Sequence, residues 1–213
     1  TVNEVLMRVG ALPRFTTNEM SYYLSWSTNG LINEYCNEAD AIYEGRQVKV
    51  MPLEGAEKIV IDGESFEAFN TSGGCATMCE TYQNKVQNLS YKTIRYPGHL
   101  NHMKFLFNDL HLKKNKDVLE KLFDKEVPRT KNDVIIFFVK VIGLIDGVLQ
   151  EKTYLRKIYG DNKFSAIQLT TASGACSVLK MFLDKKISGK GFVKQESISW
   201  NDFVENKFGQ VYA

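Results

Sequence analysis

The segment from Tyr91 to His99, Tyr-Lys-Thr-Ile-Arg-Tyr-Pro-Gly-His, has residue types and spacing suited to binding an anionic substrate. Side chains alternate between the two faces of a strand, so Thr93 and Arg95 should share one face and Lys92 should lie on the other. An arginine at a strand end can fork two hydrogen bonds onto a carboxylate. A proline-glycine turn then leaves His99 near a helix start, where a neutral imidazole could act as an acid or base near pH 7.

Other segments contain further candidate binding or acid/base residues, with less specific signals. Backbone amides around the glycines of Thr71-Ser72-Gly73-Gly74 could form a nest for an anion. The indole of Trp26 could wall a pocket, and Lys92 could be a low-pKa amine if it is buried. Simpler explanations exist for each: a strand-ending turn, a core tryptophan, a surface lysine, a solvated Arg95 and a capping His99. Residue types alone leave both sets of explanations open.

The elements that would hold these residues follow from hydrophobic periodicity and from turn residues. Strands are expected at residues 5–9, 41–43, 48–50, 58–61, 66–71, 86–96, 134–145 and 148–159. Helices are expected at residues 18–36, 75–82, 100–110, 115–126, 165–183 and 200–206. Asp62-Gly63 and Asp146-Gly147 mark hairpin turns. Strands joined mostly by hairpins, with helices grouped between them, predict an α+β domain with a largely antiparallel sheet.

Composition excludes several classes of protein. The net charge of +2 is too small for a dedicated nucleic-acid binder, so we expect no nucleic-acid partner. The longest apolar run, residues 134–139, is far shorter than the roughly 18 residues that cross a bilayer, so we expect no membrane partner. The cysteines at positions 36, 75, 79 and 176 and the histidines lack zinc-site spacing, which predicts no metal and reduced thiols in a cytoplasmic protein.

The chain also lacks the motifs of a nucleotide-binding domain. There is no G-x-G-x-x-G sequence between a strand and a helix and no Walker loop, so the chain alone should not bind a dinucleotide. It opens with Thr-Val-Asn-Glu-Val, and the alternation of Val5, Met7 and Val9 is typical of a strand already under way. This start predicts a domain excised from a longer protein, with a processed or engineered start as the alternative.

Four ordered blocks carry a family resemblance that covers nearly the whole chain. They are residues 9–13 with 26–35, residues 67–74, residues 92–99, and a tail at 166–172, 191–193 and 208–209. Together they resemble the saccharopine dehydrogenase family, and within it the lysine 6-dehydrogenase-like and saccharopine dehydrogenase-related branch. The match is weakest at residues 113–131. His99 departs from the saccharopine reductases, where another residue commonly follows the glycine.

The resemblance implies a fold and a domain arrangement. Such proteins place a Rossmann domain first, followed by a domain with a mixed, largely antiparallel sheet and helices on one face. That second domain is similar to the C-terminal domain of glyceraldehyde-3-phosphate and homoserine dehydrogenases. Residues 1–213 would form this substrate-binding and dimerisation domain, and residues 165–213 would pack back toward the absent cofactor domain. A homodimer is implied, with NAD or NADP bound mainly by the N-terminal domain.

The resemblance also implies an activity, namely hydride transfer between a nicotinamide and the carbon bearing an amino-acid-derived amine. Arg95 would hold the carboxylate of the small amino-acid-derived substrate, and Trp26 would wall the pocket. Thr71, Ser72 and Gly73 would approach the substrate or the nicotinamide. His99 would be a branch-specific acid, base or polar contact, and Lys92 would be a weaker alternative for that role.

Two other functions remain open at this stage. The protein could sense a cationic amino acid or a polyamine without catalysis, or the chain could be a purely structural dimerisation module. Arg95→Ala would leave ligand affinity unchanged in the structural module, whereas a substrate clamp would lose about 2–5 kcal/mol of binding free energy. The substrate, the choice of NAD or NADP and the reaction direction are not fixed by the sequence, because the ribose-reading residues would lie in the other domain.

Overall fold

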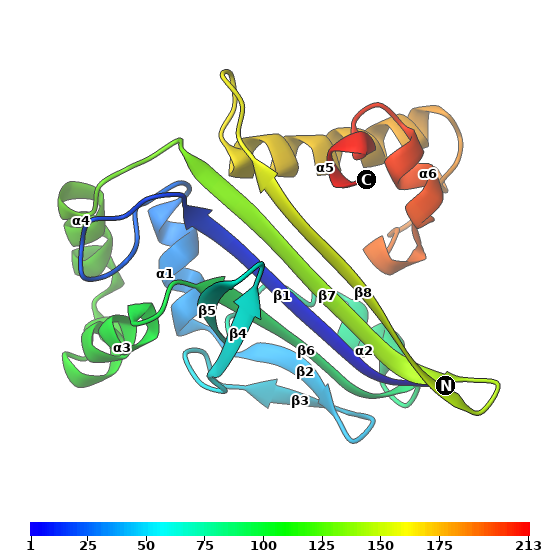
Figure 1. The fold of residues 1–213 in the computed structure, drawn as a ribbon, viewed down its shortest axis with the longest axis horizontal. Coiled ribbons are helices and arrows are strands. Elements are labelled where there is room, and N and C mark those ends of the chain that lie inside the picture. The colour runs from blue at the N-terminus through cyan, green and yellow to red at the C-terminus, as the bar shows by residue number, and fades with distance from the viewer.

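The computed structural model describes residues 1–213 and is built on one open, twisted sheet (Figure 1). Its strands are β1 (Val2–Pro13), β2 (Ala39–Tyr43), β3 (Arg46–Val50), β4 (Glu57–Ile61), β5 (Glu64–Phe69), β6 (Val86–Arg95), β7 (Asp133–Ile145) and β8 (Val148–Tyr159). The order is β3-β2-β6-β1-β7-β8, and β5 adds to the free end of β6. Only β1 and β6 run parallel, so the predicted mixed, largely antiparallel sheet is confirmed.

Two-residue turns fix the register of the hairpins. Asp146 and Gly147 both have positive φ, at 51° and 78°, and they pair Ile145 with Val148 across β7 and β8. Positive φ at both turn residues matches the twist of the flanking strands, which explains why an Asp-Gly pair stands here. Asp62-Gly63 joins β4 to β5 with the same geometry. Both predicted hairpins are confirmed.

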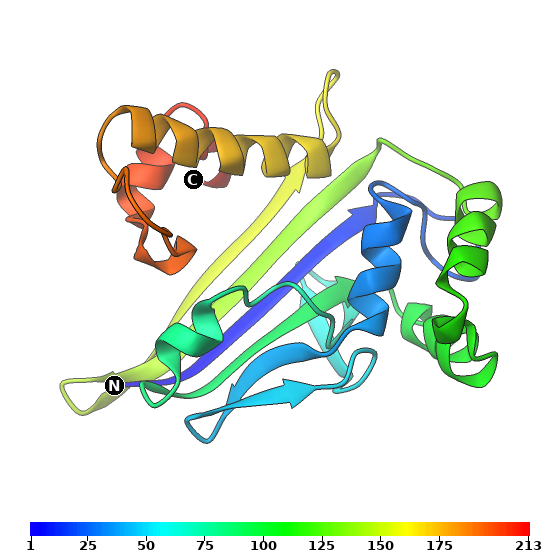
Figure 2. The same cartoon turned by 180° about the vertical axis from the view of Figure 1, so that it is seen from behind.

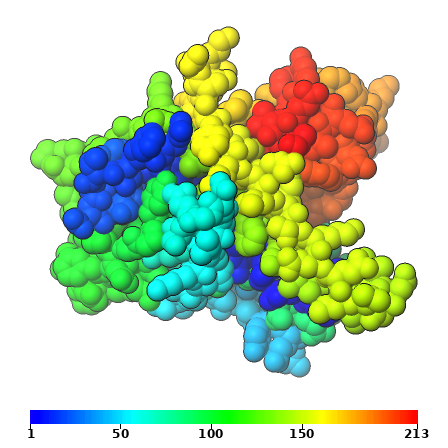
Figure 3. Space-filling view, in the orientation of Figure 1, coloured from blue at the N-terminus to red at the C-terminus, as the bar shows by residue number.

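The two faces of the sheet are covered differently. The β4–β5 hairpin folds over the face seen in Figure 1, where it appears as the cyan cover in Figure 3. Apolar side chains from the hairpin, including Phe66, pack there on Leu12, Ile94 and Ile136. Helices cover the opposite face, which Figure 2 shows. We call these the hairpin face and the helix face.

The helices are α1 (Thr28–Cys36), α2 (Met78–Tyr82), α3 (His99–Lys104), α4 (Lys116–Glu126), α5 (Ala166–Leu183) and α6 (Trp200–Glu205). In Figure 2, α1, α2 and α5 lie in front of the sheet, while α3 and α4 pack beside α1 at one end. A core of Leu31, Tyr35, Phe69, Met103 and Phe107 joins α1, β5 and the α3 region. The helix face is therefore the side on which helices can bring side chains toward the sheet.

The expected helix at residues 18–36 is wrong in its first half. The Asn18 side chain accepts from the Tyr22 amide at 3.1 Å and donates to its carbonyl at 2.9 Å, which closes a loop instead of a helical turn. The helix begins only at Thr28, after Ser27 accepts a hydrogen bond from the Gly30 amide at 3.1 Å. The aromatic spacing before Ser27 belongs to a loop that packs into the core.

The helix expected at 100–110 begins at His99 and changes character after Lys104. Residues Phe105–Asp109 form a π-helical turn, which widens the helix by one residue per turn. At its start, the carboxylate of Glu67 accepts hydrogen bonds from the amides of Gly98 and Leu100 at 3.1 and 2.6 Å. This side chain supplies the anionic cap that a helix N-terminus favours, and it fixes α3 against β5.

Helix α5 is capped by two side chains. Asp133 at the start of β7 accepts from the amides of Ala166 and Ile167 at 2.5 and 3.0 Å. Ser165 and Gln168 form a capping box at the same end. The small residues of α5 let another element approach, and here that element is the chain's own C-terminal segment. Asn206 donates to Ser177 Oγ at 2.6 Å, and Tyr212 donates to the Thr170 carbonyl at 2.6 Å.

Helix α5 is also the one helix whose length and composition would allow it to cross a membrane, with 18 residues and a mean hydropathy of 1.2. Part of that apolar character faces outward, because Leu179, Phe182 and Leu183 are 56, 46 and 65% exposed. The stripe that packs inward consists mostly of small side chains.

Candidate functional site

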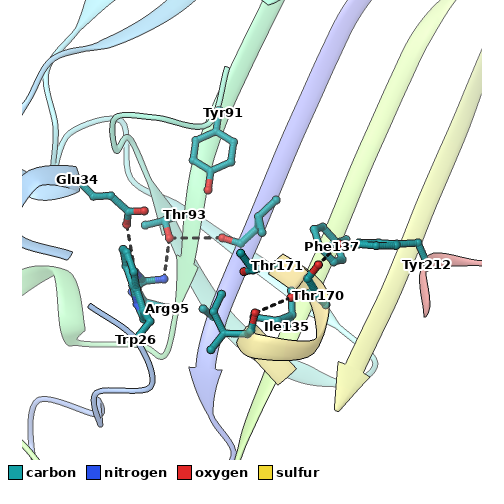
Figure 4. Close-up of a pocket in the computed structure, with 13 residues that line it drawn as sticks. Trp26, Glu34, Tyr91, Thr93, Arg95, Ile135, Phe137, Thr170, Thr171 and Tyr212 are labelled. Atoms are coloured by element: carbon teal, nitrogen blue, oxygen red, sulfur yellow. Dashed lines mark hydrogen bonds and ion pairs between the residues drawn. The ribbon is translucent and has the colours of Figure 1, made fainter. Parts of the chain in front are cut away.

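A cavity of about 260 Å³ opens on the helix face, between the sheet and the first turns of α5 (Figure 4). Thr93 and Arg95 reach it from β6, and Thr171 reaches it from α5. Glu34 of α1 and Trp26 of the preceding loop close its side. The structure thus brings Arg95 and Trp26, both predicted from sequence, into one site.

Arg95 has most of its hydrogen-bonding capacity committed to the protein. Its side chain is almost fully buried, and Nε donates to the Tyr35 hydroxyl at 2.9 Å. Nη1 donates to Thr93 Oγ1 at 2.7 Å and to the Ile94 carbonyl at 2.9 Å. Nη2 donates no hydrogen bond within the chain and lies 3.7 Å from Glu34 Oε2. The expected two-nitrogen fork is therefore not free, and Nη2 alone retains donors for a ligand.

The environment of Arg95 keeps it charged. Burial opposes the charge, but the oxygens of Tyr35, Tyr22 and Glu34 outweigh that effect and raise the pKa of the guanidinium above its ordinary value. The guanidinium carbon also lies 5.4 Å from the centre of the Tyr22 ring, within the range of a cation–π contact. The cavity therefore has a permanent positive charge at its base.

His99 lies behind Arg95 and not in the cavity. Its side chain is completely buried, with Nδ1 3.0 Å from the Met20 carbonyl and Nε2 2.9 Å from the Tyr35 hydroxyl. A carbonyl only accepts, so Nδ1 carries the proton and Nε2 accepts from Tyr35, which in turn accepts from Arg95. Burial and the nearby Arg95 lower the pKa of His99 to about 3. The imidazole is neutral, as expected, but Tyr35 separates it from any ligand, so it acts as a positioning residue.

Lys92 lies on the other face of the sheet, as strand alternation predicted. Its Nζ is 2.7 Å from Glu57 Oε2 on the hairpin face, where Glu57 also pairs with Arg8. The expectation that Lys92 could share an acid/base role at the Arg95 site is therefore wrong. The sheet separates the two side chains.

This placement makes a prediction about Lys92. We expect Lys92→Met to leave ligand affinity at the Arg95 cavity unchanged and to lower stability by about 1 kcal/mol, because it removes one partly buried ion pair. Calorimetric titration of L-glutamate and urea unfolding would measure both effects. Thr93→Val is the matched comparison on the same strand, since it removes a hydrogen bond to Arg95. A tenfold loss of affinity in Lys92→Met would contradict the assignment.

Thr71, Gly73 and Gly74 line a separate recess of about 150 Å³, and Ser72 lines neither this recess nor the Arg95 cavity. Glu38 and Asp40 line the same recess and no cationic residue does, which disfavours the anion that the sequence predicted there. Ser72 instead ties the loop to α1, because its amide donates to the Glu34 carbonyl at 3.2 Å. Thr71 Oγ1 is buried without a hydrogen-bond partner. The structure therefore separates Thr71 and Gly73 from the Arg95 cavity.

Two glycines set the shape of the Arg95 site. A Cβ on Gly74 would lie 2.2 Å from the Tyr91 ring, and a Cβ on Gly30 would lie 2.6 Å from the Trp26 ring. Because real contacts are never that short, only glycine lets these rings lie flat against the backbone. The glycines thus position Tyr91 and Trp26 as walls of the cavity.

A second, larger cavity of about 610 Å³ adjoins the first along α5. Trp26, Ile167 and Thr171 line both cavities. The outer cavity is mainly apolar, and Ser25 Oγ in its wall is buried without a hydrogen-bond partner. Together the cavities form a cleft with a charged inner end and an apolar outer end.

Sequence reasoning missed Glu34, Tyr91 and the α5 threonines. Glu34 lies within the block at residues 26–35, next to the buried Tyr35 on a helix whose other side packs into the core. The sequence signal for Glu34 was a carboxylate at the border of an apolar helix face. The α5 threonines gave none, because their position over the sheet depends on how Asp133 at the start of β7 anchors the helix.

Two comparisons with known proteins, one of sequence and one of structure, point to the same family. A family model described as the saccharopine dehydrogenase C-terminal domain matches residues 1–208. The fold is similar to that of apo histidine-tagged saccharopine dehydrogenase (L-Glu forming) from Saccharomyces cerevisiae, with a TM-score of 0.71 and 15% sequence identity. The alignment covers 90% of this chain and 61% of that chain. The chain thus spans less than two thirds of that enzyme, and at this identity the likeness concerns the fold alone.

Proposed function

The chain belongs to the saccharopine dehydrogenase family as its C-terminal domain, and on that premise we propose that its Arg95 cavity binds the substrate of an NAD(P)-dependent oxidoreductase acting on a CH–NH group. The observation that carries this proposal is Nη2 of Arg95, which donates no hydrogen bond within the chain, lies 3.7 Å from Glu34 and lines the cavity as its one cation. A substrate carboxylate would supply the acceptors that Nη2 lacks. Lysine and saccharopine are both amino acids of the proposed class.

The cofactor would be held mainly by an N-terminal Rossmann domain elsewhere in the protein. This chain's own contribution fits at the outer cavity, where the unpartnered hydroxyl of Ser25 and the ring of Trp26 could contact a nicotinamide carboxamide and ring. Bound NAD or NADP supplies the hydride acceptor. The residues of this chain would orient the substrate carbon and exclude water, with Trp26 and Tyr91 as the walls.

We also propose where the remaining partners lie. Leu179, Phe182 and Leu183 expose an apolar strip on α5 that a cofactor domain would cover. Leu149 at the β7–β8 hairpin is 64% exposed, and a second copy in a homodimer would bury this region. The family membership and the free cysteines are compatible with a cytoplasmic protein.

The test follows reduced nicotinamide by absorbance with the full-length protein. Lysine, saccharopine and carboxynorspermidine are each supplied with NAD and with NADP. We expect turnover of one pair, and we expect Trp26→Phe to raise its KM about tenfold, because the substitution removes ring contact and the hydrogen bond from Nε1 to Tyr22. Trp200→Phe is the matched control, since Trp200 lies in α6 and lines neither cavity.

The outcomes separate the proposed functions. Turnover that both tryptophan variants retain equally would move catalysis away from the Arg95 cavity. Ligand binding without turnover in any combination would contradict the oxidoreductase and favour a sensor of amino acids or polyamines. Absence of binding would leave a structural dimerisation module.

A further inference from the structure

Cys75 and Cys79 form a pair of free thiols in a small core beside α2. Cys79 lies in α2, and the amide of Met78 donates to the Cys75 carbonyl at 2.9 Å, which closes the turn that leads into the helix. Both cysteine side chains are buried, and they pack in one cluster with Ile42 and Leu89. A single turn of chain therefore holds the two sulfurs in the same core.

The Cys75 thiol also joins two strands of the sheet. β2 and β6 pair through Ile42 and Leu89. Continued by two residues, this antiparallel register places Asp40 opposite Tyr91. The Cys75 thiol donates to the Asp40 carbonyl at 3.2 Å, and the Tyr91 amide donates to the same sulfur. The thiol thus lies between a carbonyl and an amide that belong to opposite strands.

The two thiols titrate differently because they interact with each other. The pKa of Cys79 is lowered and the pKa of Cys75 is raised, and the largest cause of both shifts is the hydrogen bond between the two side chains. Cys75 shares its one hydrogen between Cys79 and the Asp40 carbonyl. Since the thiolate is the nucleophilic form of cysteine, Cys79 is the more reactive member of the pair.

We infer that Cys75 and Cys79 are a redox-modification site, at which a peroxide converts the two thiols reversibly into a disulfide that loosens β2 from β6. Disulfides in reducing compartments are mostly transient ones of this kind. The inference goes beyond the proposed function, and it holds whether or not the Arg95 cavity binds an amino acid.

The reaction needs one hydrogen peroxide for each pair of thiols. The Cys79 sulfur attacks a peroxide oxygen, so an S–O bond forms, the O–O bond breaks and the second oxygen leaves as water. The Cys75 sulfur then attacks the Cys79 sulfur, so an S–S bond forms, the S–O bond breaks and a second water leaves. The two sulfurs are oxidised and the two peroxide oxygens are reduced.

A recess gives a small oxidant access to the pair. Cys75 lines the recess of about 150 Å³ together with Gly73, Gly74 and Ala76, whose side chains are small or absent. This space is large enough for a molecule little bigger than water. The turn between the cysteines holds Ala76 at a φ of 43°, a left-handed conformation that is costly for alanine. Movement of Cys75 toward Cys79 therefore changes a strained turn and not a regular element.

Oxidation of the pair acts on Tyr91 through two contacts. A disulfide has no S–H group, so the Asp40 carbonyl loses its donor, and the Cys75 sulfur moves away from the Tyr91 amide. Gly74 precedes Cys75 and lies against the Tyr91 ring. Because Tyr91 is a wall of the Arg95 cavity, the redox state of the pair reaches one side of that cavity.

The experiment treats the full-length protein with hydrogen peroxide, alkylates the remaining thiols and identifies the tryptic peptides by mass. Cys75 and Cys79 fall in one peptide, residues 59–85, whereas Cys36 and Cys176 fall in two others. We expect the peptide 59–85 to carry no alkyl group and to be lighter than its dithiol form by two hydrogen atoms. Dithiothreitol should restore both thiols, which separates a disulfide from the irreversible sulfinic and sulfonic acids.

Hydrogen exchange at the Tyr91 amide is the second measurement. We expect exchange to become about tenfold faster in the oxidised protein, because the amide loses its acceptor and the neighbouring strand loosens. Cys79→Ala should form no disulfide and should show no change at Tyr91 after peroxide. Cys176→Ala is the matched control, since Cys176 lies in α5 outside this core, and it should behave as the wild type.

Each outcome decides part of the inference. If the wild-type peptide 59–85 keeps two alkylated thiols under conditions that oxidise Cys176, the two cysteines only fill the core and the redox site is overturned. A disulfide from Cys75 or Cys79 to any other peptide would also overturn it. A disulfide within the peptide, with unchanged exchange at Tyr91, would overturn the loosening of β2 from β6. These tests use the wild type, so they stand even if Cys79→Ala does not fold.

Discussion

An Arg95→Met substitution is expected to abolish measurable ligand binding and to lower the free energy of unfolding by about 3–5 kcal/mol at pH 8. Methionine fills similar volume but donates nothing to Tyr35 or Thr93 and leaves the ionised Glu34 without its cation. Removing one partner of a buried ion pair costs far more than the pair contributes, because the other charge remains desolvated. Urea unfolding measures the stability, and titration with L-glutamate measures the binding.

The same argument predicts a partial rescue. Adding Glu34→Gln to Arg95→Met removes the stranded carboxylate, so the double variant should be more stable than Arg95→Met alone at pH 8. Arg46→Met on β3 is the control for loss of an arginine, since Arg46 is exposed and should change stability by about 0.5 kcal/mol or less. An Arg95→Met protein as stable as Arg46→Met, or a double variant less stable than both single ones, would contradict the pairing described here.

The sequence was sufficient for the parts of the fold that depend on local rules. Alternation along β6 correctly placed Arg95 and Lys92 on opposite faces, and Asp-Gly pairs located both hairpins. The start of α1 was wrong because helical spacing of apolar residues also occurs in a loop that packs into the core. There, the hydrogen bond between Asn18 and Tyr22 and the cap at Ser27 determine where the helix begins. The spacing of apolar residues reveals neither of these contacts.

The site was predictable only one residue at a time. The residues Arg95 and Trp26 were chosen for their chemistry, but depth and direction decide what each can do. His99 has suitable chemistry, yet Tyr35 stands between it and the cavity. Glu34 became visible only when α1 was placed against β6, where Arg95 Nε donates a hydrogen bond to the Tyr35 hydroxyl.

The buried neighbours of Arg95 also predict how stability depends on pH. His99 titrates at about 3 in the fold against 6.5 ordinarily, so the unfolded chain binds its proton first and His99 destabilises the fold as pH falls below 6.5. Glu34 titrates at about 7 against 4.5, so the fold binds its proton first and Glu34 stabilises the fold as pH falls from 7 to 4.5. Between pH 7 and 4.5 each effect is about 3 kcal/mol, and the two oppose each other.

We therefore expect two variants to diverge from the wild type in opposite directions. On acidification from pH 7 to 4.5, Glu34→Gln should lose about 3 kcal/mol of unfolding free energy relative to wild type, because it keeps His99 and lacks the compensating carboxyl. His99→Gln should gain about 3 kcal/mol relative to wild type over the same range, since it keeps only the Glu34 effect. Urea unfolding at half-unit pH steps measures both, and differences from wild type cancel the carboxyls common to all three proteins. Parallel curves for the three proteins would contradict the burial of Glu34 and His99, whereas curves that diverge in opposite directions would show that both groups titrate with the shifted pKa values described here.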